Sequence, residues 1–345
     1  MRYLGGKSRL APAIFNLARQ VAPTADSLTD LFAGSGALSY YFKQQGFAVT
    51  TNDLLFFSYA MSHGTLAINK LPQFRRLRAL LGQDPREYLN SCQLPKLDTS
   101  QVIRLTYSPD SSPERRYLTR DNALRIDFAR QQIEAWKREG LVSSDEYFHL
   151  LAAIVLGVPP VSNITGTYGA FLKYWDKRAL NPYTVAEVGV FDNGKKNRSY
   201  NLDALALLGR ISGQVLYLDP PYNERQYLPN YHVLETVARY DYPTVTGVTG
   251  QRPVGTGKSA FCSKKTALGT LEEVVVAAQF EHIILSYNNE GVVSTDELTE
   301  MLRAHAAPGS YRLTTIPYRR YKNKIPNHAD GLVEQLHYIR KGGAA

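Results

Sequence analysis

A short apolar run that stops at two consecutive prolines constrains the fold of this chain more than any other feature. Residues 214–218, Gln-Val-Leu-Tyr-Leu, have the composition of a buried strand, and Asp219-Pro220-Pro221-Tyr222 follows directly. Prolines cannot continue a strand ladder, so the strand ends here and the backbone beyond it is stiff. A carboxylate, two carbonyl oxygens and an aromatic ring are thereby held at the carboxyl end of a strand, where open α/β sheets bind ligands. The cluster suits a planar aminated heterocycle, although an ordinary proline turn has the same local pattern.

A turn of small residues follows an earlier predicted strand. Residues 28–32 read as that strand, the turn is Ala-Gly-Ser-Gly-Ala with Gly34 and Gly36, and a helical pattern begins at residue 38. Glycines let a ligand approach the backbone, and a helix N-terminus favours a carboxylate or phosphate. Asp53 ends the next strand, nineteen residues after Gly34, near the ~20 expected of an acid that binds a ribose. The third glycine of the dinucleotide fingerprint is missing, which favours a nucleoside without a pyrophosphate, such as S-adenosylmethionine (AdoMet), over NAD.

The amino-terminal segment carries two glycines and a lysine before the first predicted helix. Tyr3 begins the run Tyr-Leu-Gly-Gly-Lys-Ser, in which Lys7 could face a carboxylate and Ser8 is expected to cap a helix that runs to about residue 21. An ordinary helix start with a solvated lysine fits the same residues.

Taken in this order, the motifs resemble those of the adenine-specific DNA amino-methyltransferases of the Dam-like, restriction-modification type. In the matching subgroup the cofactor segments come first, a target-recognition region follows, and the catalytic motif comes last. The matching stretches are residues 3–7, 30–36, 52–53 and 219–222, with similar flanks at 223–227, 230–235 and 285–291.

The resemblance implies AdoMet as the methyl donor, and no metal. Lys7 is expected near the methionine carboxylate and Asp53 at the ribose hydroxyls. Asp203 is expected at the adenine, although an acid at a helix N-terminus explains that position equally well. The expected cofactor-binding residues are Tyr3, Lys7, Asp30, Phe32, Gly34, Gly36, Asp53, Asp203 and Asp219.

The same resemblance implies methyl transfer to the N6 amino group of an adenine flipped out of double-stranded DNA. The catalytic residues are then Asp219 and the Pro220 carbonyl, which accept the N–H bonds of the amine, and Tyr222, which stacks on the base. Cytosine N4, adenine in RNA and a protein glutamine remain alternative acceptors, and a catalytically inactive DNA-binding relative is an alternative of another class. The chain lacks the Pro-Cys motif typical of carbon-5 cytosine methylation.

Charge supports a polyanionic partner. The chain has 345 residues and a formal net charge of +9, and residues 70–140 hold fourteen Lys/Arg against nine Asp/Glu. Residues 251–265 contain Arg252, Lys258, Lys264 and Lys265 but no acid, and we expect residues 245–265 to form a flexible basic loop near DNA. The run Gly-Thr-Gly-Lys-Ser at 255–259 lacks the first glycine of a P-loop and follows no strand.

Strand and helix patterns alternate at both ends of the chain but not in the middle. The sequence predicts an α/β fold: a mostly parallel twisted sheet of the Rossmann-like AdoMet-dependent methyltransferase type, with a terminal antiparallel hairpin at 311–318 and 332–339. Residues 1–64 and 200–345 would form a discontinuous catalytic domain, in which one helix is expected to reach residue 211 and another to lie around residues 231–240. Residues 65–199, with helices expected at about 72–81, 120–138 and 145–156, would form an inserted, largely helical recognition domain, or a helical addition that only buttresses the core.

The expected environment is the cytoplasm, with nucleoid association through DNA. No apolar run reaches the ~18 residues of a membrane span, and no signal peptide is recognised. Cys92 and Cys262 are expected to be reduced thiols. Double-stranded DNA is the expected partner, and a separately encoded cognate restriction endonuclease is a further candidate.

Overall fold

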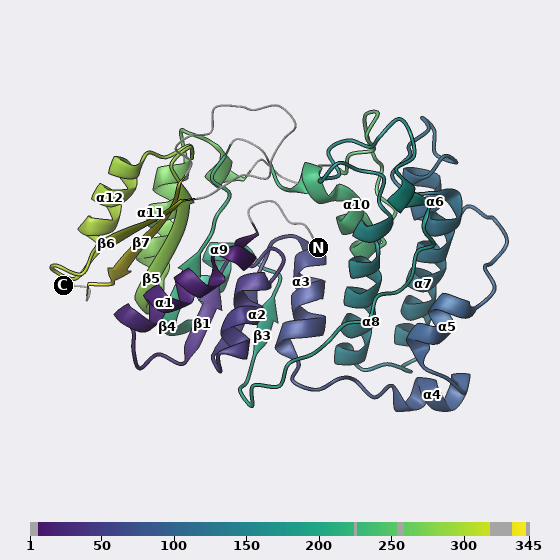
Figure 1. The fold of residues 1–345 in the computed structure, drawn as a ribbon, viewed down its shortest axis with the longest axis horizontal. Helices are drawn as coiled ribbons and strands as arrows, with labels where there is room; N and C mark the ends of the chain where they lie inside the picture. Colours follow the sequence, from purple (N-terminus) through teal and green to yellow (C-terminus); the bar gives the residue numbers. More distant parts are fainter. Residues whose placement is uncertain (1–5, 224–225, 254–258, 318–332, 343–345) are drawn as a thin grey trace.

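The computed structural model describes residues 6–223, 226–253, 259–317 and 333–342. Two halves lie side by side: a sheet covered by helices on both faces, and a bundle of helices (Figure 1). Among the described residues, no helix is both long enough and apolar enough to cross a membrane.

A seven-stranded sheet forms the first half, with the order β3-β2-β1-β4-β5-β7-β6. The first five strands in the chain run parallel, and β7 lies antiparallel between β5 and β6. This confirms the predicted fold class and the terminal hairpin. The strands are β1 (Ser27–Asp30), β2 (Ala48–Asn52), β3 (Arg198–Tyr200), β4 (Ser212–Leu218), β5 (Gln279–Asn288), β6 (Arg312–Pro317) and β7 (Val333–Arg340).

The apolar run in β4 is unbroken because both faces of the sheet are covered. Val215 and Tyr217 pack under α1 and α2, whereas Leu216 and Leu218 pack under α9, α11 and α12. Successive side chains of a strand point to opposite faces, so a doubly covered strand is apolar throughout. The covering helices are α1 (Ala11–Val21), α2 (Ala37–Gln44), α9 (Ala204–Leu208), α11 (Ala267–Ala277) and α12 (Thr295–Ala304).

The second half is helical and is built around one large apolar cluster. Its helices are α3 (Phe56–Ser62), the π-helical turn η2 (His63–Ala67), α4 (Arg75–Leu81), α5 (Pro85–Ser91), α6 (Val102–Tyr107), α7 (Arg120–Arg138), α8 (Ser144–Gly157) and α10 (Leu228–Arg239). The described residues also form short 3₁₀ turns in both halves of the molecule: η1 (Lys7–Arg9), η3 (Pro159–Val161), η4 (Lys177–Leu180) and η5 (Ala260–Cys262).

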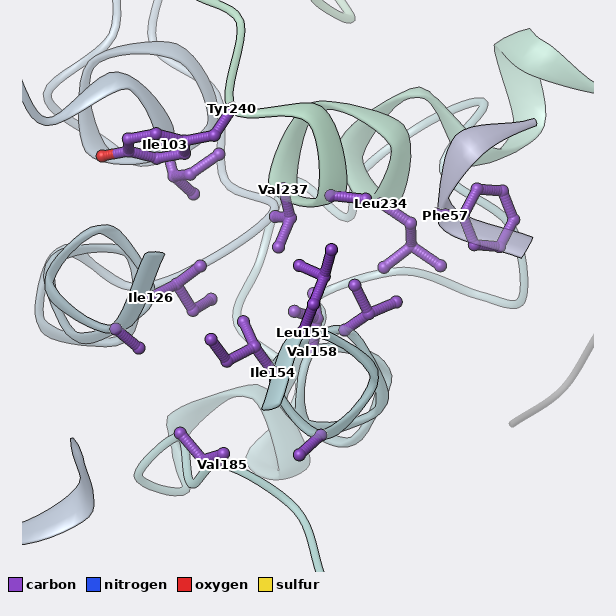
Figure 2. Packing of buried hydrophobic residues seen from close by; sticks show 14 of the residues in the cluster. Phe57, Ile103, Ile126, Leu151, Ile154, Val158, Val185, Leu234, Val237 and Tyr240 are labelled. Atoms are coloured by element: carbon purple, nitrogen blue, oxygen red, sulfur yellow. The ribbon is translucent and has the colours of Figure 1, made fainter. Parts of the chain in front are cut away.

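Two helices from outside residues 65–199 belong to this cluster. The helix predicted around residues 231–240 is present as α10, but Leu234 and Val237 pack against α8 residues such as Leu151, and Phe57 of α3 lies in the same core (Figure 2). The helix itself was predicted from the sequence. Its partner was not, because periodicity reports a buried face and not what covers it.

Several predicted helix boundaries were wrong for local reasons. Ser8 lies within η1, and α1 begins after Leu10 without a side-chain cap. The helix expected to reach residue 211 ends at Leu208. The short helices α5 and α6 were not predicted. Asp127 of α7 accepts the N–H groups of Ile103 and Arg104, so α6 is capped by a residue distant in sequence.

Candidate active site

A cavity of about 810 Å³ opens at the carboxyl edge of the parallel strands. Parallel strands end at the same edge, so the residues after β1, β2 and β4 meet there. Seven predicted site residues line the cavity: Lys7, Asp30, Phe32, Gly34, Asp53, Asp203 and Asp219. Gly36, Pro220 and Tyr222 are not among its lining residues, although each adjoins one that is. Tyr3 lies outside the described residues.

The glycine turn after β1 depends on left-handed backbone. Gly34 has φ of 53° and Gly36 has φ of 73°, a region that L side chains avoid. A Cβ on Gly36 would also lie 2.9 Å from Leu66 Cδ1. The turn is tied to the sheet by the Ala33 N–H, which donates to the Asn52 carbonyl at 2.9 Å. Backbone N–H groups are thereby presented at the cavity at the start of α2.

Asp53 links the glycine turn to the end of β2. Its Oδ2 accepts the Gly34 N–H at 2.8 Å, and its Oδ1 accepts the Leu55 N–H at 2.8 Å. The nineteen-residue spacing seen in the sequence is therefore a direct hydrogen bond. Burial raises the pKa of Asp53 to about 6 despite these donors. Each carboxylate oxygen retains a lone pair, so Asp53 can still accept a hydroxyl.

Asp30 ends β1 and is buried below the turn. Its Oδ2 accepts the Ser39 hydroxyl at 2.8 Å, and within the described residues its Oδ1 has no hydrogen-bond partner. Burial, with smaller contributions from the charges of Asp219 and Asp53, raises the pKa of Asp30 to about 7. A buried acceptor of this kind is rare in folded proteins and suits a ligand donor.

Asp219 forms an ion pair with Lys7. Lys7 Nζ lies 2.8 Å from Asp219 Oδ1 and 3.1 Å from Oε1 of Glu334 on β7. Removal from water raises the pKa of Asp219 to about 6, and the charge of Lys7 opposes that shift. Burial disfavours the charge on Lys7, but the attraction of Asp219 and other neighbours prevails and raises its pKa well above the usual value. The lysine expected at a cofactor carboxylate is thus shared by two carboxylates of the protein.

Tyr222 lies beside this cluster. Its ring centroid is 5.5 Å from Lys7 Nζ and 5.8 Å from the ring of Tyr287, with the two rings edge to face. The Val292 N–H donates to the Tyr222 carbonyl at 2.9 Å. Tyr287, in the flank at 285–291, therefore packs against the Asp-Pro-Pro-Tyr corner.

Asp203 serves as a helix cap. Its Oδ1 accepts the N–H groups of Leu205 and Ala206 at the start of α9, as the helix-start alternative implied. It also lines the cavity, so its predicted contact with the adenine of the cofactor stays a prediction.

Residues from the helical half complete the cavity, and the sequence analysis assigned no role to them. Glu235 of α10 lines it and accepts the N–H groups of Phe56 and Phe57 at 3.1 and 3.0 Å, capping α3. Arg239 also lines it and pairs with Glu235. Their i, i+4 spacing is readable as a helix pair, but a cap supplied to another helix has no local signature. The role of Glu334 was also missed, because its ion pair with Lys7 joins residues far apart in sequence.

Arg252, one of the basic residues expected near DNA, is held by an acidic side chain in this structure, and its expected proximity to DNA stays a prediction. Its guanidinium forms two hydrogen bonds to Asp241, at 2.7 and 2.6 Å, and it lines the cavity. The described part of the predicted flexible basic loop makes defined contacts, and its flexibility and its place near DNA stay predictions. Thr246 and Gln251 form an isolated bridge, and Arg115 donates to the carbonyls of Gly247 and Val248. Residues 254–258, including Lys258, lie outside the described residues.

The cavity fits a nucleoside with a polar tail. Its volume is in the range of small-molecule sites. Phe32, Leu205 and Phe261 provide apolar walls, and Phe32 and Phe261 pack edge to face with centroids 5.2 Å apart. The acceptors of Asp30 and Asp53 and the close backbone approach at the glycine turn suit hydroxyl and carboxylate groups. The described residues contain no cluster of three or more metal-ligand side chains.

Comparisons with known proteins identify the family of this chain. The family model of D12 class N6 adenine-specific DNA methyltransferases matches residues 3–301. The chain is 40% identical to the Type II methyltransferase M.FokI of Planomicrobium okeanokoites and 39% identical to the modification methylase StsI of Streptococcus sanguinis. Each match covers 99% of this chain but 53% and 52% of the relative, so the chain spans about half the length of these two. It is also 36% identical to the Type II methyltransferase M.NlaIII of Neisseria lactamica, over 99% of both chains. The chain therefore belongs to the family of D12 class N6 adenine-specific DNA methyltransferases.

Proposed function

We propose that this chain transfers a methyl group from AdoMet to the N6 amino group of a flipped-out adenine in double-stranded DNA, as the modification enzyme of a restriction-modification system. The observation that carries the proposal is the single cavity onto which both Asp219 and the glycine turn at Gly34 open. Family membership supplies the reaction class, and the cavity supplies a place where donor and acceptor can meet.

The cofactor would occupy the part of the cavity next to β1 and β2. When bound, AdoMet supplies an activated methyl group on a positively charged sulfur. Asp53 would accept its ribose hydroxyls while it holds the Gly34 N–H, and the N-terminus of α2 would face a polar group of the cofactor. Phe32 and Phe261 would exclude water from its apolar faces. Tyr3, Asp30, Gly36 and Asp203 are proposed to contribute as the family resemblance implies.

The target amine would bind at the Asp-Pro-Pro-Tyr corner. Asp219 and the Pro220 carbonyl would accept its two N–H bonds and aim its lone pair at the donor. Bonds to an ionised acceptor are about twice as strong as neutral ones. Tyr222 would stack on the base, and such stacking returns roughly 1–3 kcal/mol of the flipping energy. Because the amine is a weak nucleophile, positioning supplies most of the acceleration.

The helical half would recognise the DNA target. Residues 65–199 contribute most of it, and the segment 163–180 carries the exposed side chains Lys173, Tyr174 and Lys177. Lysines suit phosphate contacts and an exposed tyrosine suits base contact. DNA binding would place the protein at the nucleoid, and a cognate restriction endonuclease is a proposed functional partner.

Nucleoside analysis tests the function directly. The protein is incubated with methyl-labelled AdoMet and duplex DNA of mixed sequence, and the DNA is then digested to nucleosides. Labelled N6-methyladenosine in its deoxy form is expected. Label in N4-methylcytosine would overturn the choice of base, and label only in a parallel RNA sample would overturn the choice of polymer. Absence of label, with AdoMet binding intact by calorimetry, would favour a non-catalytic DNA-binding relative.

A further inference from the structure

The cavity is acidic in a chain that is basic overall. Among the residues that the structure describes, six acidic residues line it, namely Asp30, Asp53, Asp203, Asp219, Glu235 and Glu273. The described basic residues in its lining are three, namely Lys7, Arg239 and Arg252. The formal net charge of the whole chain is +9, so the cavity departs from the charge of the rest of the protein.

Lys7, which lines the cavity, forms ion pairs with two carboxylates. Lys7 Nζ lies 2.8 Å from Asp219 and 3.1 Å from Glu334. The side chains of Lys7 and Glu334 are only 5% and 3% exposed, so solvent does little to screen the cluster. With all three groups ionised, the cluster has one negative charge in excess. A lysine paired with Asp219 alone would have left it neutral.

Glu334 is held in place by the sheet. Strand β7 pairs it with Asn288 of β5, and Glu334 Oε1 accepts the hydroxyl of Ser286 from the same strand. The antiparallel insertion of β7 thus brings a carboxylate beneath Lys7 from the opposite end of the chain. Among the described residues, Asp30 Oδ1 has no hydrogen-bond partner. It adds a second buried acceptor to the same cavity.

We infer that Glu334 is a positioning residue that makes the cavity prefer a cationic ligand, by sharing Lys7 with Asp219 and so leaving excess negative charge beside the reacting centre. The inference rests on the proposed function. AdoMet carries a positive sulfonium, whereas its demethylated product, S-adenosylhomocysteine, carries a neutral thioether at that position. The two share their adenosine and their amino-acid tail. Glu334 therefore favours the methyl donor over the spent product, and so limits product inhibition.

Calorimetric titration of the full chain measures this preference. Dissociation constants are determined at pH 8 for AdoMet, for S-adenosylhomocysteine and for sinefungin, which bears an ammonium group in place of the sulfonium. In Glu334→Gln, the ratio of product to donor dissociation constants is expected to fall on the order of tenfold, because one unit charge is lost from the buried cluster that contains Lys7 and Asp219. The ratio of the dissociation constant of the product to that of sinefungin is expected to fall as well, because sinefungin also carries a positive charge at this position.

Two variants separate charge from structure. Glu300→Gln makes the same chemical change at an exposed position of α12 in the same half, and the ratio should stay at the wild-type value. Glu334→Asp retains the charge and should restore most of the ratio. An unchanged ratio in Glu334→Gln, or an equal fall in Glu300→Gln, would overturn the inference.

If Glu334→Gln does not fold, Lys7→Gln gives a test of opposite sign. At pH 8.5 it leaves two carboxylates without the lysine charge, so the ratio should rise. Contacts of Lys7 to the shared tail affect both ligands alike and cancel. A constant or falling ratio in this variant would refute the inference. A wild-type protein that binds none of the three ligands would defeat the proposed function itself, whereas AdoMet binding with an unaltered ratio defeats only the role of Glu334.

Discussion

The two halves of the molecule bury different kinds of groups. The sheet edge buries charge: Lys7 and Asp30 are almost fully buried, and the pKa values of Asp30 and Asp219 are raised. The helical half buries a continuous apolar cluster in which Leu151 and Ile154 are fully covered (Figure 2). Burying ionisable groups opposes folding, whereas burying apolar surface drives it. The helical core, together with the two apolar faces of the sheet, stabilises a fold that keeps an unfavourable set of charges at its reactive edge.

The largest effect is expected where the charged edge carries the chemistry. Asp219→Ala removes the ionised acceptor of the target amine, and kcat should fall on the order of 10³-fold. AdoMet binding should weaken but stay measurable by calorimetry, because Asp53 and the glycine turn are untouched. Asp296→Ala removes an exposed acid from α12 and should retain activity. Near-normal turnover of Asp219→Ala in a labelled-methyl assay would remove Asp219 from the mechanism.

The apolar core should respond in stability instead. Leu151→Ala deletes a fully buried side chain of α8, and the free energy of unfolding should fall by about 2–5 kcal/mol. Exposed Leu80, at 63% accessibility, is the matched control, and Leu80→Ala should change stability by less than about 0.5 kcal/mol. Urea unfolding measures both. A change in AdoMet affinity of Leu151→Ala, measured at temperatures where the variant is folded, would contradict this division between a core that sets stability and a sheet edge that binds the ligand.

Backbone strain at the glycine turn should give a smaller loss. Gly36→Ala forces an L residue into left-handed backbone and places a Cβ 2.9 Å from Leu66 Cδ1, for a cost of roughly 1–3 kcal/mol. Gly46 has φ of 85° with open space around it, so Gly46→Ala measures the backbone strain alone. In thermal unfolding, the melting temperature of Gly36→Ala should be lower than that of Gly46→Ala. The affinity for AdoMet should fall only in Gly36→Ala. Equal effects in both variants would show that contact with Leu66 is unimportant.

The pH dependence of activity should give the smallest effect. Asp219 must be ionised to accept the N–H bond of the target amine, and its pKa is raised to about 6. The value of kcat/KM should therefore fall about tenfold between pH 7 and pH 5. Asp53, also raised to about 6, titrates in the same window, and Asp53→Asn should keep the inflection if Asp219 is its source. Circular dichroism at pH 5 checks that the fold is intact. A flat profile between pH 5 and pH 7 would contradict the assignment.

The sequence predicted the sheet edge well because its motifs are contiguous. A strand, a turn and an acid lie within a few residues of one another, and parallel strands bring such segments to one edge whatever lies between them. The α/β class, the terminal hairpin and the long helix at 120–138 could all be read from local pattern, whereas the hydrogen bond between the Gly34 turn and Asp53 could not. The helical core was predicted as separate helices without their partners.

What only the tertiary structure decided are contacts between residues far apart in sequence. Glu334 shares Lys7 with Asp219, Glu235 caps α3, Arg252 pairs with Asp241, and α10 packs with the helical half. Charges and caps have no periodicity, and their partners are fixed by how strands and helices stack in space. By itself, the sequence determined which chemical groups stand at the ends of the strands. The fold determined which of them share a proton or a charge, because electrostatic coupling in a desolvated site depends on distances of a few ångströms that sequence spacing does not encode.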